Sequence, residues 1–344
     1  MKQLIVNKED LKCNITKITE YAKKISNDNN YTIICVAKGN GYGLDLVKYA
    51  EYMRSNGIEY FAVATIEEAL KLSKANITEN ILMLSPLNQK DELEEAIKSN
   101  IIVTVASKEN AKDLMELAKK GYNIRAHIKI DTGFGRYGFV YDDYDNIITT
   151  IKELKKSIDV EGIFSHFSMP YYKNNKYTLT QFERFNKILE LLDKNNIEIK
   201  LKHICNSSAL LNYPQMHLNA ARIGSAFLGR ACSENDDIKL RKIGELQVSV
   251  AEVRTIPKNF HISYLSIYKT KKEEKIAILP IGYIEGVNLS PRTDMYRKRD
   301  HIKRALRELK NLFKDQRIKV KINGQIYNVV GTIRYVSCRC KSRW

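Results

Sequence analysis

Eight short apolar runs, each the length of a buried strand, lie between residues 31 and 229 and constrain the fold more than any other feature. The runs span residues 31–37, 60–64, 81–84, 101–106, 124–130, 160–164, 201–205 and 221–228. Each of the first six is followed by a segment whose apolar residues recur every three or four positions, which is typical of an amphipathic helix. This alternation predicts an α/β fold built as a parallel (β/α)8 TIM-type barrel, with functional residues at the carboxyl ends of the strands.

A change of pattern after residue 236 predicts a second domain. Residues 246–253 alternate polar and apolar side chains, as strands with one solvated face do. Asn323-Gly324 lies in another alternating stretch and is typical of a two-residue hairpin turn. Because 344 residues exceed what one core usually holds, we expect a barrel at 10–235 and a mainly β domain at 236–344.

One basic segment, residues 290–317, interrupts the β pattern. Its apolar residues Ile302, Leu306, Leu309 and Phe313 fall on one face of a helix. We expect this amphipathic helix to pack on the β domain, in preference to docking on nucleic acid or on a membrane.

The formal charge of +17 does not by itself indicate a nucleic-acid partner. Lysines are spread through most helical segments and mixed with glutamates, so we expect a solvated basic surface that attracts phosphate-bearing cofactors and carboxylates. The chain shows neither a signal peptide nor an apolar stretch long enough to span a bilayer, which favours a cytoplasmic protein. Its six cysteines lack paired ligand spacing, so we expect reduced thiols and no metal site.

A lysine ends the first apolar run, in a segment rich in glycine. The segment reads Val36-Ala37-Lys38-Gly39-Asn40-Gly41-Tyr42-Gly43. An amine at a strand end can form an imine with an aldehyde cofactor, while glycines let the backbone approach a bulky ring and a tyrosine hydroxyl can contact phosphate. On these residues alone, a surface lysine that caps a strand before a glycine turn is the preferred interpretation.

This segment resembles the K-A-N-A-Y-G motif of the alanine racemases, barrel-type enzymes dependent on pyridoxal 5′-phosphate (PLP). Other stretches resemble successive motifs of that family, in the same order and over most of the chain. They are residues 61–69, 127–136, 162–167, 206–209, 222–224 and 280–283. The insertion at 290–317, which ordinary alanine racemases lack, looks more like the soluble racemase domain of vancomycin-resistance alanine/serine racemases. The resemblance also implies that residues 1–9 join the β domain.

The resemblance implies PLP-dependent racemisation of a small amino acid, alanine first and serine next, which supplies peptidoglycan precursors. Racemisation needs two acid/base groups on opposite faces of a planar, cofactor-stabilised carbanion. By resemblance, Lys38 is one of them, and Tyr264 from the partner subunit of a homodimer is the other. Tyr283 is expected beside Tyr264, in contact with the substrate.

Other site residues follow from the same resemblance. Arg222 is similar to the arginine that faces the pyridine nitrogen of PLP, and because a guanidinium cannot accept a proton, that nitrogen should stay unprotonated. His166 is expected against the ring, and Arg136 at the substrate carboxylate or the cofactor phenolate. In relatives, Lys129 is often carbamylated and orients Arg136. The remaining expected cofactor-binding residues are Tyr42, Asn206, Ser207, Gly224 and Ser225, most of them for phosphate near strands seven and eight.

The resemblance ends after Gly331. The family continues into a methionine-bearing strand and several further strands, whereas residues 332–344 no longer read like a β domain. A shifted reading frame is one hypothesis for this change. We expect PLP binding to survive and turnover to be weak or absent. The alternatives are another barrel-type PLP activity, such as a decarboxylase or a D-amino-acid dehydratase, or a degenerate PLP-binding protein with little or no activity.

Overall fold

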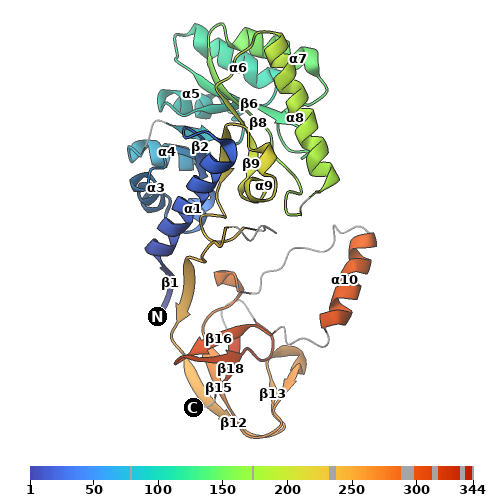
Figure 1. The fold of residues 1–344 in the computed structure, drawn as a ribbon. Helices are drawn as coiled ribbons and strands as arrows, with labels where there is room; N and C mark the ends of the chain where they lie inside the picture. Colours follow the sequence, from blue (N-terminus) through green and yellow to red (C-terminus); the bar gives the residue numbers. More distant parts are fainter. Residues whose placement is uncertain are drawn as a thin grey trace. The chain divides into compact units, whose positions relative to one another are not determined.

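The computed structural model describes residues 1–77, 80–172, 174–231, 238–287, 298–311, 317–333 and 338–342 (Figure 1). The chain forms two compact units, one of residues Asn7–Ile243 and the other of residues Met1–Val6 with Gly244–Trp344. The first unit is an α/β barrel and the second is mainly β.

Eight parallel strands form the barrel, as the apolar runs predict. In the order in which they pair, they are β4 (Ile81–Met83), β3 (Tyr60–Val63), β2 (Thr32–Val36), β10 (Ala220–Ile223), β9 (Leu201–Asn206), β8 (Asp159–Phe164), β6 (Arg125–Asp131) and β5 (Val103–Val105). A parallel bridge between Leu82 and Ile102 joins the two ends of this sheet. A short strand, β7 (Phe139–Val140), pairs with β6. Strands buried on both faces read as continuous apolar runs, which is why the sequence predicts them well.

Helices connect successive strands and lie outside the barrel (Figure 1). They are α1 (Lys8–Ser26), α2 (Lys38–Tyr42), α3 (Leu46–Ser55), α4 (Ile66–Lys74), α5 (Lys90–Lys98), α6 (Lys108–Lys119), α7 (Tyr144–Leu154), α8 (Lys176–Lys194), α9 (Ser207–Asn212) and the short η1 (Pro214–Met216). Several begin at a side-chain cap: Asn7, Thr65, Ser107 and Asn175 each accept a hydrogen bond from the backbone N–H three residues later. Such caps satisfy amide donors that a helix start leaves without partners.

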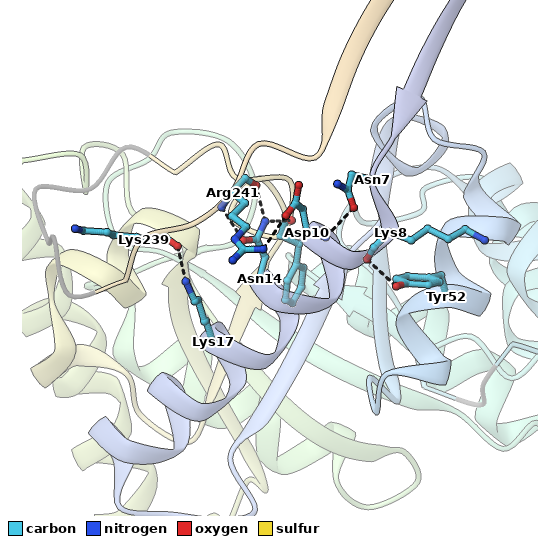
Figure 2. Close-up of polar contacts among 9 residues, drawn as sticks. Asn7, Lys8, Asp10, Asn14, Lys17, Tyr52, Lys239 and Arg241 are labelled. Carbon is cyan, nitrogen blue, oxygen red and sulfur yellow. Dashed lines mark hydrogen bonds and ion pairs between the residues drawn. The ribbon is translucent and has the colours of Figure 1, made fainter.

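The first helix, α1, is tied to the segment with which the barrel unit ends (Figure 2). The fully buried amide of Asn14 donates to the carbonyl of Arg241 at 2.7 Å and accepts from its N–H at 2.8 Å. Lys17 donates to the carbonyl of Lys239 at 2.8 Å, and the Arg241 guanidinium pairs with Asp10 at 3.0 Å. Residues distant in sequence therefore close this side of the barrel unit through hydrogen bonds.

The second unit consists of small antiparallel sheets. They are the pairs β1 (Lys2–Val6) with β11 (Gly244–Val248), β13 (His261–Ile262) with β14 (Tyr268–Lys269) and β16 (Lys319–Ile322) with β17 (Gln325–Asn328), and a sheet of β12 (Glu252–Ile256), β15 (Glu274–Leu279) and β18 (Cys338–Ser342). Two one-turn helices, η2 (Tyr264–Ser266) and η3 (Tyr283–Glu285), and the longer α10 (Lys298–Asn311) complete its described part. Its core packs Leu279, Ile281, Val329 and Ile333 together.

The structure confirms the predicted hairpin turn and corrects the predicted length of the eighth strand. The hairpin at Asn323-Gly324 is confirmed, because both residues have the positive φ that such a turn requires, 47° and 81°. The eighth strand is shorter than predicted: β10 ends at Ile223, and the chain turns where Phe227 N–H donates to the carbonyl of Gly224. An apolar run alone does not distinguish a buried strand from a buried turn.

The expectation that residues 332–344 do not belong to a β structure is wrong in part. Residues 338–342 form β18, which pairs along its length with β15. Strand pairing uses backbone groups that every sequence offers, and here Cys340 also buries its side chain in the core of the second unit. Residues 334–337 and 343–344 lie outside the described residues.

The helix predicted inside the basic segment forms as α10, but its predicted packing is wrong. Ile302, Leu306 and Leu309 are 62%, 57% and 57% exposed, so this apolar face does not pack on the β domain. The face is only a few residues wide and lies among basic side chains, so little apolar area is available to hold the helix in place. Phe313 lies outside the described residues. Neither α10 nor any other described helix has the length and apolar character that a membrane span needs.

Candidate active site

A cavity of about 220 Å³ opens at the carboxyl ends of the barrel strands. It is lined by Val36, Lys38, Tyr42, Leu84, Arg136, Phe164, His166, Tyr171, Asn206, Ser207, Ser208, Arg222, Gly224 and Ser225. The lining contains three cations, Lys38, Arg136 and Arg222, and no carboxylate among the described residues. A concave site with this charge favours anionic ligands.

Lys38 begins a left-handed turn directly after β2. Gly39, Asn40, Gly41 and Tyr42 have φ values of 66°, 54°, 65° and 57°. L-residues other than glycine and asparagine rarely adopt this conformation, which explains the Gly-Asn-Gly sequence and leaves Tyr42 as the strained member. The turn brings both Lys38 and Tyr42 to the cavity wall.

Glu68 of α4 holds this left-handed turn. Its Oε1 accepts a hydrogen bond from the backbone N–H of Asn40 at 2.9 Å, and its Oε2 accepts one from Ala64 at 3.2 Å. The side chain of Asn40 in turn accepts from the backbone N–H of Leu46 at 3.1 Å. Hydrogen bonds to a carboxylate are stronger than neutral ones, so Glu68 stabilises the turn that carries Lys38.

A second wall of the cavity forms where β9 and β10 end. The hydroxyl of Ser207 accepts hydrogen bonds from the backbone N–H groups of Gly224 and Ala226, at 3.1 and 3.3 Å. A Cβ at position 224 would lie 2.0 Å from the hydroxyl oxygen of Tyr42, so glycine lets this hydroxyl approach the wall and a larger residue would require Tyr42 to move. Burial raises the pKa of Tyr42 to about 12, which keeps its hydroxyl protonated and able to donate. The backbone N–H groups orient the Ser207 hydroxyl, and this hydroxyl and that of Tyr42 are donors that suit a phosphate group.

Arg222 is buried at the end of β10, and its guanidinium makes five hydrogen bonds through its two Nη atoms. Nη1 donates to Nδ1 of His203 at 2.7 Å and to its carbonyl at 3.1 Å. Nη2 donates to the carbonyls of Ser165 and Ile204, at 2.6 and 3.3 Å, and to Nδ1 of His166 at 3.2 Å. None of these bonds uses Nε–H, which leaves that donor for a ligand. Burial lowers the pKa of Arg222 to about 10, so the group is still charged at neutral pH.

His166 lines the cavity beside Arg222. Burial, followed by the positive charges of Arg222 and Lys129, lowers its pKa well below the usual range, so the ring is neutral at pH 7. Its Nδ1 accepts from Arg222, and its ring makes an edge contact with Phe134 at 5.0 Å between centroids. His166 therefore adds a neutral wall beside a buried cation.

Lys129 on β6 is buried next to the cavity but does not line it. Its Nζ donates to the carbonyl of Ile130 at 2.9 Å and lies 5.1 Å from the ring centre of Phe164. Burial first, and the charge of Arg222 second, lower the pKa of this amine well below the usual range. The neutral form is therefore favoured inside the barrel.

The loop that carries Arg136 is organised by Asp131. The carboxylate of Asp131 accepts hydrogen bonds of 2.8 to 3.2 Å from the backbone N–H groups of residues 133–136. Partial burial acts to raise the pKa of Asp131, but these donors prevail and lower it. Arg136 itself is exposed and lies over the ring of Phe134, at 4.6 Å from its centre.

The cavity brings together the residues that the sequence proposes for cofactor binding. Lys38, Tyr42, His166, Asn206, Ser207, Arg222, Gly224 and Ser225 all line it, and so does Arg136. Tyr264 and Tyr283 belong to the other unit, where Tyr264 is 64% exposed.

Five further lining residues were not predicted from the sequence: Val36, Leu84, Phe164, Tyr171 and Ser208. Leu84 and Phe164 end apolar runs and Val36 ends β2, so the rule that barrel sites lie at strand ends does point to them. Tyr171 lies in the loop after β8, where no pattern marks it.

Comparisons with known proteins give one consistent result. The family model described as "Alanine racemase, N-terminal domain" matches residues 6–231, and "Alanine racemase, C-terminal domain" matches residues 243–335. The chain is 38% identical to "Alanine racemase 2" of Caldanaerobacter subterraneus subsp. tengcongensis over 74% of its own length and 66% of that relative. It is 36% identical to an alanine racemase of Methanococcus maripaludis, over 80% and 74% of the two chains.

Solved structures agree with these relatives. The structure of an alanine racemase from Clostridium difficile 630 matches with a TM-score of 0.80 and 28% identity, and covers 99% of this chain and 82% of that one. The match to the Caldanaerobacter relative covers 66% of that protein, so about a third of its length lies outside the matched region.

Proposed function

This chain belongs to the alanine racemase family, and on that premise we propose that it interconverts the L- and D-forms of a small amino acid, alanine first and serine next. The cofactor is PLP, on which the family depends. One observation carries the proposal: a single cavity gathers Lys38, Arg222 and the hydroxyl groups near β9 and β10. The relatives are named alanine racemases, which does not favour a decarboxylase, a dehydratase or a chain without activity.

The residues of the cavity fit this cofactor. The hydroxyl groups of Ser207, Ser225 and Tyr42 offer donors that a phosphate group needs, and the missing Cβ at position 224 lets the Tyr42 hydroxyl approach this wall. Nε–H of Arg222 is a donor without a partner in its five-bond network. The cations of the lining complement a phosphate and a substrate carboxylate.

PLP, when bound, supplies an aldehyde for the substrate amine and a conjugated ring that takes up the electron pair released at Cα. Lys38 would hold the cofactor, and its Nζ would take a proton from Cα or return one to it on one face. Arg222 would face the ring nitrogen and cannot accept a proton from it, so that nitrogen stays unprotonated. Arg136 would bind the substrate carboxylate.

The second acid/base group comes, in this proposal, from Tyr264 of a second copy of the chain. Two observations support it: the cavity is built from one unit alone, and Tyr264 is exposed in the other. Tyr283 would assist in substrate binding beside it. The active form is then a cytoplasmic homodimer with shared sites, without membrane or nucleic-acid partners, whose barrel spans 10–235 and whose β-rich domain spans 236–344 with residues 1–9.

We also propose that Lys129 is carbamylated. Carbamylation requires a neutral amine, and burial favours that form of Lys129. The modified group would carry a negative charge and would orient Arg136. A 13C signal from protein equilibrated with labelled bicarbonate, which is lost in Lys129→Ala, is the expected observation.

The main test uses the purified full chain with added PLP. We expect a visible absorption band of the lysine-linked cofactor, which Lys38→Ala abolishes, together with L-to-D conversion of alanine and a slower conversion of serine. The absorption band without conversion of either amino acid would contradict racemase function but would still support PLP binding.

A further inference from the structure

The barrel interior below the cavity contains two fully buried histidines, His127 on β6 and His203 on β9. They form a continuous series of hydrogen bonds with two further side chains. Nη1 of Arg222 lies 2.7 Å from Nδ1 of His203, Nε2 of His203 lies 3.0 Å from Nδ1 of His127, and Nε2 of His127 lies 3.0 Å from the hydroxyl of Tyr60.

The packing around this series is close. The rings of Phe164 and His203 are stacked at 5.0 Å with 1° between their planes. A Cβ at position 162 would lie 2.4 Å from the ring of His127, so Gly162 is required for His127 to occupy its place. The packing against β8 therefore fixes the positions of the two histidine rings.

Arg222 fixes the direction of every bond in the series. A guanidinium can only donate, so Nδ1 of His203 must accept, and a neutral His203 then carries its proton on Nε2. That proton is donated to Nδ1 of His127, which leaves the proton of His127 on Nε2, facing Tyr60. The reverse direction would place an N–H of His203 against an N–H of Arg222 at 2.7 Å.

Both rings are neutral at pH 7. Burial, followed by the charges of Arg125 and Arg222, lowers the pKa of His127 to about 3. Burial and the charge of Arg222 also lower the pKa of His203 well below the usual range, with smaller contributions from His127 and Lys129. A doubly protonated ring therefore does not offer an alternative to the fixed direction.

The series ends at the opposite side of the barrel from the cofactor cavity. Tyr60 lines a second cavity of about 360 Å³, together with Asn80, Arg125 and Glu161. Burial raises the pKa of Tyr60, so its hydroxyl stays protonated. Since that hydroxyl accepts from His127, its own proton is directed to water or another group in this second cavity.

We propose that His127 and Tyr60 are positioning residues for Arg222, and that they act through His203. They accept, one after the other, the hydrogen bonds whose direction Arg222 sets, and so hold the His203 ring where its Nδ1 accepts from Arg222; this bond helps to aim Nε–H of Arg222 into the cavity. The direction of the hydrogen bonds follows from the distances between these side chains and does not depend on the proposed function. Its consequence for the reaction rests on the proposed function, in which Arg222 faces the cofactor ring.

The first experiment needs no cofactor or activity. In the apoprotein labelled with 15N-histidine, NMR correlations from ring carbon-bound protons to both ring nitrogens report the tautomer and charge of each histidine. Signals are assigned by their loss in His127→Gln and His203→Gln, with the exposed His261→Gln as control. We expect both buried rings to be neutral with the proton on Nε2. A proton on Nδ1 of either ring, or a charged ring at pH 7, would overturn the proposal.

A variant tests whether Arg222 sets the direction. Arg222→Met removes the obligatory donor, so Tyr60 can then either accept from His127 or donate to it. We expect a mixture of tautomers in the two rings. Retention of the single wild-type tautomer in this variant would show that another group sets the direction.

A matched pair of variants tests the consequence for the loaded enzyme. Tyr60→Phe removes the acceptor at the end of the series, whereas Tyr31→Phe removes a buried hydroxyl in the same cavity that donates to the carbonyl of His217. We expect about a tenfold lower kcat with little change in KM, and an altered pH dependence of the cofactor band, for Tyr60→Phe only. Equal effects of the two variants on kcat and on the cofactor band would show that the hydrogen-bonded series has only a structural role, which would overturn the proposal. If the tautomers are as expected but the wild-type protein does not racemise alanine or serine, the proposed function fails and the fixed direction stands.

Discussion

The two ends of the barrel carry cavities that differ in charge: the charged side chains described around the one at the carboxyl end are cations alone, and charges of both signs line the one at the amino end. At the carboxyl end, Lys38, Arg136 and Arg222 line about 220 Å³ without a carboxylate among the described residues. At the amino end, a larger cavity of about 360 Å³ contains Arg125 bonded to Glu161. Cavity size therefore does not identify the functional end. The charged lining described for the carboxyl-end cavity consists of cations alone, whereas the lysines and Arg125 of the amino-end cavity share its lining with Glu59 and Glu161, so an anionic ligand is favoured more strongly at the carboxyl end.

The largest effect is expected from the lysine of the carboxyl end. Lys38→Ala should remove the cofactor band and lower racemisation by at least about a thousandfold, because both the covalent attachment and one acid/base group are lost. Lys200→Ala, which removes a lysine that lines the amino-end cavity, should leave kcat/KM within about twofold, the range of a surface substitution without catalytic contact. A loss of activity in Lys200→Ala comparable with that in Lys38→Ala would break the contrast between the two ends.

A smaller effect is expected from Gly224→Ala. The new Cβ would lie 2.0 Å from the hydroxyl oxygen of Tyr42, so the wall near β10 must shift and PLP affinity should fall by about tenfold or more. Adding Tyr42→Phe removes the closest clash and should recover part of the spectroscopically measured affinity relative to Tyr42→Phe alone. Gly244→Ala, whose Cβ would find its nearest neighbour at 3.5 Å, is the control and should bind PLP normally. An unchanged affinity of Gly224→Ala for PLP would show that this wall does not belong to the cofactor site.

An effect smaller than that of Gly224→Ala is expected from Glu68→Gln. The substitution replaces one charged acceptor of the left-handed turn, which we expect to weaken PLP binding by several-fold and lower the melting temperature of the loaded protein. Glu67→Gln, an exposed neighbour on the same helix, should change neither property. If the two variants behave alike, Glu68 does not support the turn that carries Lys38.

The amino end should respond in stability rather than in binding. Arg125→Gln leaves the largely buried Glu161 without its ion-pair partner, which should lower the free energy of unfolding by about 1–3 kcal/mol. PLP affinity should stay unchanged. Arg241→Gln, at an exposed ion pair with Asp10, should cost less than about 1 kcal/mol in the same urea titration. Lost PLP affinity in Arg125→Gln would mean that the two ends are not independent in binding.

The smallest effect is expected in the pH dependence of stability, from the histidines between the two ends. His127 in the folded state binds its proton only near pH 3, whereas an unfolded histidine does so near about 6.5. As the pH falls below about 6.5, the unfolded state therefore binds a proton that the folded state does not, and stability decreases. Urea midpoints at pH 7, 6 and 5 should fall less steeply for His127→Gln than for the wild type. Parallel slopes would contradict a neutral, buried His127.

The sequence predicts the barrel well because its strands are buried on both faces and follow local periodicity. The resemblance to the alanine racemases also predicts residues that the structure gathers around one cavity, because the motifs that carry them end at strand termini, where barrel sites lie. The role of Glu68 could not be predicted, because its hydrogen bonds to the turn depend on the close approach of two segments. The series from Arg222 to Tyr60 is hidden for the same reason: its members lie on four different strands.

The second unit is harder to predict from the sequence. Its strands are short and many of their side chains are exposed, so periodicity is weak and residues 338–342 enter a sheet without an apolar signal. The apolar face of α10 looks like a packing face in the sequence, yet Leu306 remains exposed. Local patterns predict that a helix forms, but not what covers it.

The central claim is that the cavity at the carboxyl end of the barrel holds PLP on Lys38. Borohydride reduction of the PLP-loaded full chain, followed by proteolysis and peptide mass spectrometry, tests it most directly. We predict a single phosphopyridoxyl modification, on the peptide that contains Lys38 and at that side chain. Modification of a different lysine, or a bound cofactor that leaves no reduced adduct on Lys38, would contradict the account.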